Sequence, residues 1–211
     1  MLKKFTFNSF QVNTYVFHDE TNICLIVDPA CYGDEEENEL FKYITDNGLK
    51  PKAIVNTHPH IDHVIGNAFI LEKFNLKPTM HASGLKVYKT SPEFANMFGF
   101  TIDEFPEPSN YLSDNQYLII GNTAVKILYT PGHVDGSVSL YFEKQGFVIT
   151  GDVLFRESVG RTDLPTGNHE KLLNSIKTKL FTLPPQTIVY PGHGEQTTIE
   201  YEMQYNPFIN E

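Results

Sequence analysis

The stretch Asn56-Thr57-His58-Pro59-His60-Ile61-Asp62-His63 carries four side chains of metal-binding types within six positions. Residues 53–55 before it form an apolar run typical of a buried strand, and residues 64–67 after it are typical of a helix start. Imidazole nitrogens with a carboxylate suit zinc or iron better than magnesium or calcium, which prefer oxygen ligands. The stretch therefore predicts a metal-binding corner after a strand. The alternative is a polar loop with exposed histidines.

Three further candidate ligands also follow predicted strands. One ends the segment Thr130-Pro131-Gly132-His133, one follows Gly151, and one ends Pro191-Gly192-His193. Because α/β sheets place their sites at the carboxyl ends of strands, we expect these residues to meet the first group. Seven ligands suggest two ions that share a carboxylate and keep open positions for water and substrate. The seven candidates are His58, His60, Asp62, His63, His133, Asp152 and His193.

The rest of the chain predicts two similar halves of strands followed by helices. The first half has expected strands at 5–7, 12–17, 23–27 and 52–56, and helices over 34–47 and 63–74. The second has expected strands at 117–120, 124–129, 137–142, 147–150 and 187–190, and helices over 171–181 and 199–205. Residues 84–115 show no clear period, and we expect an excursion with a short helix at 93–98 lying over the site. Its aromatic residues are expected to pack in the core in preference to contacting substrate. The outline permits two sheets flanked by helices.

Composition restricts the class of protein. The chain has 211 residues, 40% of them hydrophobic and 20% charged, as expected of one globular domain spanning residues 1–211. Its formal net charge of −10 argues against nucleic acid as a partner, although a divalent metal can still attract a small anionic substrate. Two cysteines are too few for a disulfide scaffold, and residues 1–8 lack the apolar centre of a signal peptide. With no membrane-spanning run, the expected location is the cytoplasm.

Together the motifs resemble a known family. The order His-x-His-x-Asp-His, Thr-Pro-Gly-His, Gly-Asp and Pro-Gly-His is similar to that of the metallo-β-lactamase superfamily over nearly the whole chain. The resemblance implies an α/β fold, a four-layer αββα sandwich with a dinuclear centre between its sheets. It implies that His58, His60 and His133 hold one ion, that Asp62, His63 and His193 hold the other, and that Asp152 bridges them. The aspartate at 152 favours glyoxalase II-like hydrolases over zinc β-lactamases, which lack it.

A second resemblance concerns the subfamily. Residues 156–165 and the ending Asn206-Pro207-Phe208 are similar to small bacterial glyoxalase II-like proteins, also called hydroxyacylglutathione hydrolase-like. In that family a basic residue at the position of Arg161 contacts a carboxylate of glutathione, which suits a guanidinium group. The alternative for Arg161 is a structural ion pair with Asp163 or Glu157.

The expected function is that of a metal-dependent thioesterase. A hydroxide bridging two divalent ions would attack a thioester such as S-lactoylglutathione, with Asp62 and Asp152 as catalytic carboxylates. Zinc is the expected metal, with iron or manganese as alternatives. Two other activities stay open: a persulfide dioxygenase with one iron on His58, His133 and Asp152, and hydrolysis of another small ester or lactone. A binding module with structural zinc is disfavoured, because such sites are usually closed and rich in cysteine. Substrate, metal and oligomeric state are left open by the sequence.

Overall fold

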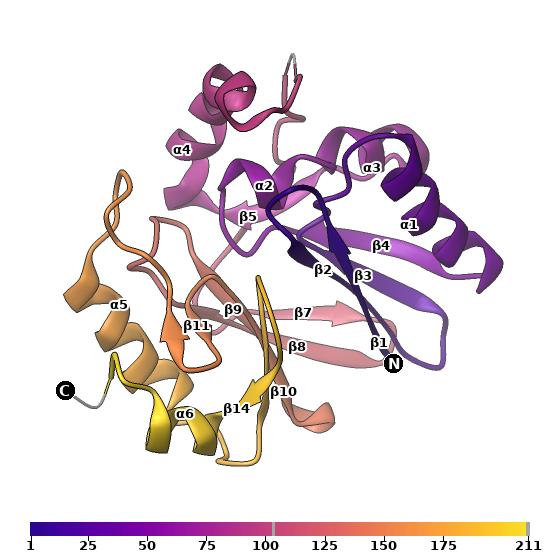
Figure 1. Ribbon diagram of the computed structural model, residues 1–211. Coiled ribbons are helices and arrows are strands. Elements are labelled where there is room, and N and C mark those ends of the chain that lie inside the picture. Colours follow the sequence, from indigo (N-terminus) through magenta and orange to yellow (C-terminus); the bar gives the residue numbers. More distant parts are fainter. Residues whose placement is uncertain (103, 210–211) are drawn as a thin grey trace.

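Two six-stranded sheets face each other in the computed structural model, which describes residues 1–102 and 104–209 (Figure 1). The first sheet has the order β1-β2-β3-β4-β5-β6, antiparallel from β1 to β3 and parallel from β3 to β6. Every residue of β2 is buried, because both faces of this sheet are covered. The strands are β1 (Leu2–Phe7), β2 (Val12–His18), β3 (Ile23–Val27), β4 (Lys50–Val55), β5 (Pro78–His81) and β6 (Asn110–Leu112).

The second sheet has the order β14-β13-β10-β9-β8-β7 and is antiparallel except where β10 pairs with β13. A small hairpin of β11 and β12 lies beyond β10 in the chain. The strands are β7 (Tyr117–Ile120), β8 (Thr123–Tyr129), β9 (Val138–Phe142), β10 (Phe147–Gly151), β11 (Leu154–Phe155), β12 (Ser158–Val159), β13 (Ile188–Pro191) and β14 (Thr197–Thr198).

Helices cover the outer face of each sheet, with α1 and α3 on the first and α5 and α6 on the second (Figure 1). The α-helices are α1 (Asp34–Asp46), α2 (Ile61–Val64), α3 (Asn67–Phe74), α4 (Leu85–Thr90), α5 (His169–Ser175) and α6 (Ile199–Tyr205). Short turns of other helix types are η1 (Ala82–Gly84), η2 (Ser91–Phe98), η3 (Glu143–Gln145) and η4 (Ile176–Leu180).

Three apolar cores separate the four layers. Leu40 of α1 and Ile70 of α3 pack on the first sheet in one core. A second core lies between the sheets and contains Phe17 of β2 and Phe142 of β9, whose ring centroids are 4.6 Å apart. The third joins the second sheet to α5, η4 and α6 and contains Leu172. These layers confirm the αββα sandwich expected from the sequence, while the single-domain expectation stays a prediction.

Hydrogen bonds join the two sheets near both ends of β2. Beyond its carboxyl end, the Asp19 carboxylate accepts from the backbone N–H of Asn122 at 2.6 Å and from the Thr123 hydroxyl at 3.3 Å. At its other end, the backbone N–H of Asn13 donates to the Gly192 carbonyl at 2.7 Å, and Val12 forms a β-bridge with His193. The first hairpin and the last ligand loop therefore hold each other in place.

The structure differs from the sequence expectations in local detail. The helix expected over 63–74 ends at Phe74 as predicted, but it is divided into α2 and α3 at Ile65 and Gly66. Gly66 donates its N–H to the Pro29 carbonyl at 2.8 Å, and a Cβ there would lie 2.7 Å from that oxygen, so the chain turns at this contact. The helix expected over 171–181 begins two residues earlier and continues after Ser175 as the π-helical η4.

The excursion at 84–115 is more ordered than expected. It contains α4, η2 and β6, and its Phe100 and Phe105 are buried with Ile61 of α2 in a satellite core. The short helix expected at 93–98 is part of η2. Among residues 1–102 and 104–209, no helix has the length and apolar character needed to cross a lipid bilayer.

Candidate metal centre

All seven candidate ligands follow the carboxyl ends of strands, at one edge of the two sheets. His58 and His60 lie in the loop after β4, Asp62 and His63 lie in α2 directly after that loop, and the loops after β8, β10 and β13 carry one candidate each. Because β4 belongs to the first sheet and the other three strands belong to the second, the candidates meet at the seam between the sheets. The sequence rule that places sites at strand ends therefore located every member of the group.

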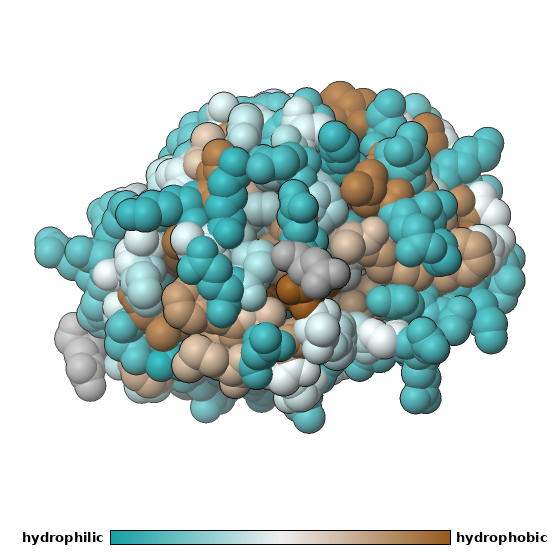
Figure 2. Space-filling view, turned by 90° about the horizontal axis from the view of Figure 1, so that it is seen from above, coloured by the Kyte–Doolittle hydropathy of each residue, from teal (hydrophilic) through white to brown (hydrophobic). Residues whose placement is uncertain are grey.

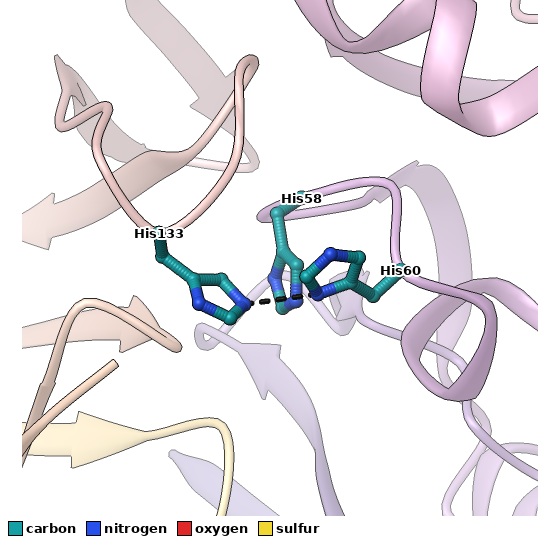
Figure 3. Close-up of side chains that lie close together, drawn as sticks. All are labelled: His58, His60 and His133. Atoms are coloured by element: carbon teal, nitrogen blue, oxygen red, sulfur yellow. Dashed lines mark hydrogen bonds between the residues drawn. The ribbon is translucent and has the colours of Figure 1, made fainter. Parts of the chain in front are cut away.

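The first cluster consists of His58, His60 and His133, whose rings face one another (Figure 3). Their ligand atoms lie within 4.8 Å of one another, and Nε2 of His133 is 2.9 Å from Nδ1 of His60. Burial and the neighbouring histidines lower the pKa of His60 to about 4 and that of His58 well below its usual value. Burial also lowers the pKa of His133. All three rings are therefore neutral at pH 7 and can offer lone pairs.

The second cluster consists of Asp62, His63 and His193. Their ligand atoms also lie within 4.8 Å of one another. Nε2 of His63 lies 3.2 Å from Nε2 of His193, and the Asp62 carboxylate is 3.5 Å from the latter nitrogen. Burial opposes protonation of both rings, but the carboxylates of Asp152 and Asp62 raise the pKa of His63 to about 9 and that of His193 to about 10. Without a metal, protonation of this pair of rings balances the buried carboxylates.

Asp152 lies between the two clusters. Its Oδ2 is 3.8 Å from Nε2 of His133 and 3.5 Å from Nε2 of His193, and its Oδ1 is 3.4 Å from Nε2 of His63. Burial alone would raise the pKa of this carboxyl group, but the surrounding histidines hold it well below its usual range. A Cβ on Gly192 would lie 2.1 Å from Oδ1 of Asp152, so a glycine is required beside this carboxylate.

Asp28 is a functional candidate that the sequence analysis missed, although it follows β3 in the same way that the ligands follow other strands. Its carboxylate accepts from Nδ1 of His63 at 3.0 Å and from both the backbone N–H and the hydroxyl of Thr57 at 2.6 Å. Since the Thr57 proton goes to Asp28, its oxygen accepts from Nδ1 of His58 at 3.0 Å. Asp28 therefore orients one histidine in each cluster, one directly and one through Thr57.

The remaining supporting hydrogen bonds come from backbone carbonyls. Nδ1 of His133 donates to the carbonyl of Arg161 at 2.7 Å, and Nδ1 of His193 donates to the carbonyl of Phe10 at 2.9 Å. Such bonds fix the tautomer that leaves Nε2 free of a proton in the neutral ring. Four of the five histidines thus direct Nε2 into the centre, and His60 directs Nδ1.

Two buried atoms at the centre make no hydrogen bond to any described residue: Nε2 of His58 and Oδ1 of Asp152. A buried polar atom without a partner is costly, so such an atom usually indicates a ligand. Neutral imidazole nitrogens and ionised carboxylates are the donor set of zinc, iron and manganese sites. The residues present therefore fit divalent metal ions in both clusters.

The Arg161 side chain points into solvent, where its guanidinium forms a double hydrogen bond with the Asp163 carboxylate at 2.8 and 2.7 Å. This is the ion pair given above as the alternative to a substrate contact. The Arg161 backbone carbonyl nevertheless holds His133, so the side chain starts beside the first cluster. Its contact with a substrate stays a prediction.

Comparison with known proteins gives a consistent result. The sequence pattern of the metallo-beta-lactamase superfamily matches residues 8–193. The chain is 37% identical over 201 residues to the probable metallo-hydrolase YqgX of Bacillus subtilis, covering 95% of this chain and 93% of the relative. It is 34% identical over 206 residues to the hydroxyacylglutathione hydrolase GloC of Haemophilus influenzae, covering 96% and 94%.

Three solved structures are similar over nearly all of this chain. The B3 metallo-beta-lactamase BLEG-1 gives a TM-score of 0.91 at 34% identity, with full coverage of both chains. TTHA1623 in a di-iron-bound form gives 0.87 at 35% identity, covering 98% of this chain and 99% of that one. ETHE1 from Myxococcus xanthus gives 0.80 at 26% identity, covering 98% and 83%.

Proposed function

This chain belongs to the metallo-β-lactamase superfamily, and from that premise we propose that it hydrolyses thioesters such as S-lactoylglutathione. The similarity to a probable metallo-hydrolase and to a hydroxyacylglutathione hydrolase supports a metal-dependent hydrolase. The observation that carries the proposal is the pair of adjoining donor clusters with Asp152 between them. The similarity to GloC over 96% of the chain supports a glutathione thioester as the substrate class.

In this proposal His58, His60 and His133 hold one ion, and Asp62, His63 and His193 hold the other, with Asp152 shared. Zinc is our first choice of metal, while the di-iron form of TTHA1623 supports iron as the main alternative. Bound at these positions, two divalent ions would lower the pKa of a water molecule toward neutrality and polarise an acyl carbonyl.

The chain's own residues prepare the centre for this chemistry. Asp62 has a lowered pKa, since the neighbouring His63 and His193 outweigh its burial, so its carboxylate is ionised at neutral pH. An ionised Asp62 can accept a hydrogen bond from an incoming water and orient it. Asp28 and Thr57 keep the histidine protons on the outer nitrogens, so that the lone pairs point inward.

The experiment is a metal reconstitution assay. Protein stripped with a chelator is refilled separately with zinc, iron and manganese, and thiol release from S-lactoylglutathione is followed. We expect release that requires metal, and we expect His58→Ala and Asp152→Ala to lose metal and activity together. Full turnover by either variant without bound metal would reject the proposal, as would the absence of release from a protein with both clusters filled.

A second candidate is a persulfide dioxygenase using one iron on His58, His133 and Asp152. The similarity to ETHE1 at 26% identity and a TM-score of 0.80 favours testing it. Oxygen consumption with glutathione persulfide and one iron per chain would support this alternative. Because BLEG-1 is named a B3 metallo-beta-lactamase, a chromogenic β-lactam belongs in the same assay series. We expect it to react slowly or not at all.

A further inference from the structure

Five large apolar side chains remain exposed on one part of the surface, which we name the apolar rim. They are between 37% and 79% exposed, and they are five of the twelve exposed large apolar side chains in the described part of the chain. Figure 2 looks down on the end of the molecule that carries α4 and η2, where brown apolar residues interrupt the teal polar surface. The apolar rim consists of Phe10, Tyr32, Phe94, Met97 and Phe98.

Aromatic contacts hold the apolar rim together. The ring centroid of Phe10 is 5.9 Å from that of Phe98 and 5.8 Å from that of the buried Phe100. Tyr32 packs edge-on against the same Phe100 at 5.0 Å, and its hydroxyl accepts from the backbone N–H of Thr101. Phe10, Tyr32 and Phe98, from three distant parts of the sequence, therefore meet around or next to the buried Phe100, and Phe94 and Met97 belong to the same short helix as Phe98.

This surface borders the second donor cluster. Ser91 at the start of η2 donates to the Pro59 carbonyl at 3.3 Å, and Ala95 shares a core with Ile61 of α2, the helix that carries Asp62. The Phe10 carbonyl accepts from Nδ1 of His193. The residue two positions before Phe10, Asn8, donates to the backbone carbonyl of Asp62 at 2.9 Å. A substrate held at the second cluster thus lies next to the apolar rim.

Charge indicates which part of a substrate fits there. The carboxylate of Glu36 lies beside Tyr32 of the apolar rim, where it accepts from the backbone N–H groups of Asn8 at 2.8 Å and Tyr32 at 2.9 Å. It would repel the carboxylates of a glutathione-like carrier. The Arg161 backbone carbonyl accepts from His133, so the Arg161 side chain starts beside the first cluster and not beside the second. An uncharged apolar group is therefore the part of the substrate that this surface favours.

We propose that the apolar rim receives the acyl group of the substrate, so that thioesters with an apolar chain of several carbons or an aromatic ring are preferred over lactoyl. The reaction itself rests on the proposed function above. Complete burial of one methylene group strengthens binding about fourfold, and half burial on an open surface strengthens it about twofold. The four additional methylenes of hexanoylglutathione should therefore raise kcat/KM about fifteenfold over acetylglutathione.

The experiment compares hydrolysis of acetyl-, lactoyl- and hexanoylglutathione by the metal-loaded protein and by the double variant Met97→Ala/Phe98→Ala. We expect the hexanoyl-to-acetyl ratio to fall about threefold or more in the variant. The matched control is Ile119→Ala, since Ile119 is an exposed apolar residue on β7, outside the donor clusters and the apolar rim, and it should leave the ratio unchanged. Circular dichroism establishes that both variants fold.

A binding measurement separates this inference from the proposed reaction. S-hexylglutathione and S-methylglutathione cannot be hydrolysed, and calorimetry gives their affinities for the metal-loaded protein and the double variant. Tighter binding of the hexyl compound, lost in the variant, supports the apolar rim even if no thioester is cleaved. Equal affinities, or equal kcat/KM for acetyl and hexanoyl thioesters, would overturn the inference. If the kcat/KM values for the acetyl and hexanoyl thioesters were equal, the thioesterase proposal would still stand.

Discussion

Replacing Asp28 by asparagine tests whether one carboxylate orients both clusters. Asparagine has nearly the same shape and tolerates the left-handed backbone of this position, where φ is +48°. The carboxylate accepts three hydrogen bonds, two of them at Oδ2. The backbone N–H of Thr57 can only donate, so we expect the amide oxygen to take the Oδ1 position and the NH₂ group to take the Oδ2 position, where both wild-type bonds are lost. At about 1.5 kcal/mol for each bond to a charged acceptor, the two losses destabilise the metal-free protein by about 3 kcal/mol.

The same substitution should weaken metal binding. The amide N–H₂ would face Nδ1 of His63 and the Thr57 hydroxyl, two groups that both donate to the wild-type carboxylate. His63 and His58 would then favour the tautomer with the proton on Nε2, the nitrogen that points into the centre. Loss of such a supporting bond typically reduces metal affinity 10- to 100-fold, so we expect about that loss in each cluster.

Urea denaturation measures the stability loss, and competition with a chromophoric chelator measures the metal affinities. The matched control is Asp19→Asn, because the Asp19 carboxylate also accepts several hydrogen bonds, from Thr21, Asn122 and Thr123, and lies at the other end of β2. It should cost similar stability and leave metal affinity unchanged. If Asp28→Asn bound two ions as tightly as the wild type, the orienting role assigned to Asp28 would be wrong.

Three further predictions concern the same centre. Since the pKa of His63 is raised to about 9 and that of His193 to about 10, an ion must displace their protons, so affinity at the second cluster should rise up to about 100-fold per unit between about pH 6 and 8. The first cluster holds neutral histidines, so its metal affinity should change little with pH. If a chelator titration gave the same pH dependence for both clusters, these protonation states would be wrong. Gly192→Ala places a Cβ against Asp152 and His63 and should reduce metal affinity more than about tenfold. The control is Gly194→Ala, which has open space around its Cβ. Because the φ angle of Gly194 is positive, this variant should lose only about 1 kcal/mol of stability. Arg161→Ala removes a solvent-exposed ion pair that contributes little to stability, so an increase of about tenfold or more in KM for S-lactoylglutathione, with unchanged metal content, would indicate a substrate contact. The control is Arg156→Ala, which removes the exposed pair with Glu195, and an unchanged KM in Arg161→Ala would leave Arg161 a structural residue.

That the seven candidate residues lie together could be predicted from the sequence, because they obey a topological rule. Each candidate follows a strand, and carboxyl ends of neighbouring strands meet at one edge of a sheet. Asp28 obeys the same rule after β3, yet an Asp-Pro pair also suits an ordinary turn, and only the 3.0 Å contact with His63 distinguishes the two interpretations. The break at Gly66 was equally hidden, because its cause is a contact with Pro29 and Cys31 rather than a local propensity.

The short elements were missed for a different reason. β5 begins with a proline and has four residues, and β14 has only two, so neither shows enough alternation to be detected. Their place is decided by pairing with β4 and β13. The apolar rim was hidden as well. Phe94 and Phe98 have the same apolar character as the buried Phe100, and only the fold determines that they face water.

The contacts of Val12 and Asn13 with Gly192 and His193 bear on the order of events during translation. The opening hairpin leaves the ribosome early, but it cannot complete these contacts until roughly 180 further residues have been made. For most of that time the His58 loop has neither His133 nor His193 to complete its clusters. Closing such a long chain segment is a slow, non-local step of folding. In nascent chains that stop before this loop, the second cluster therefore lacks His193, and the opening hairpin lacks its partner strand end.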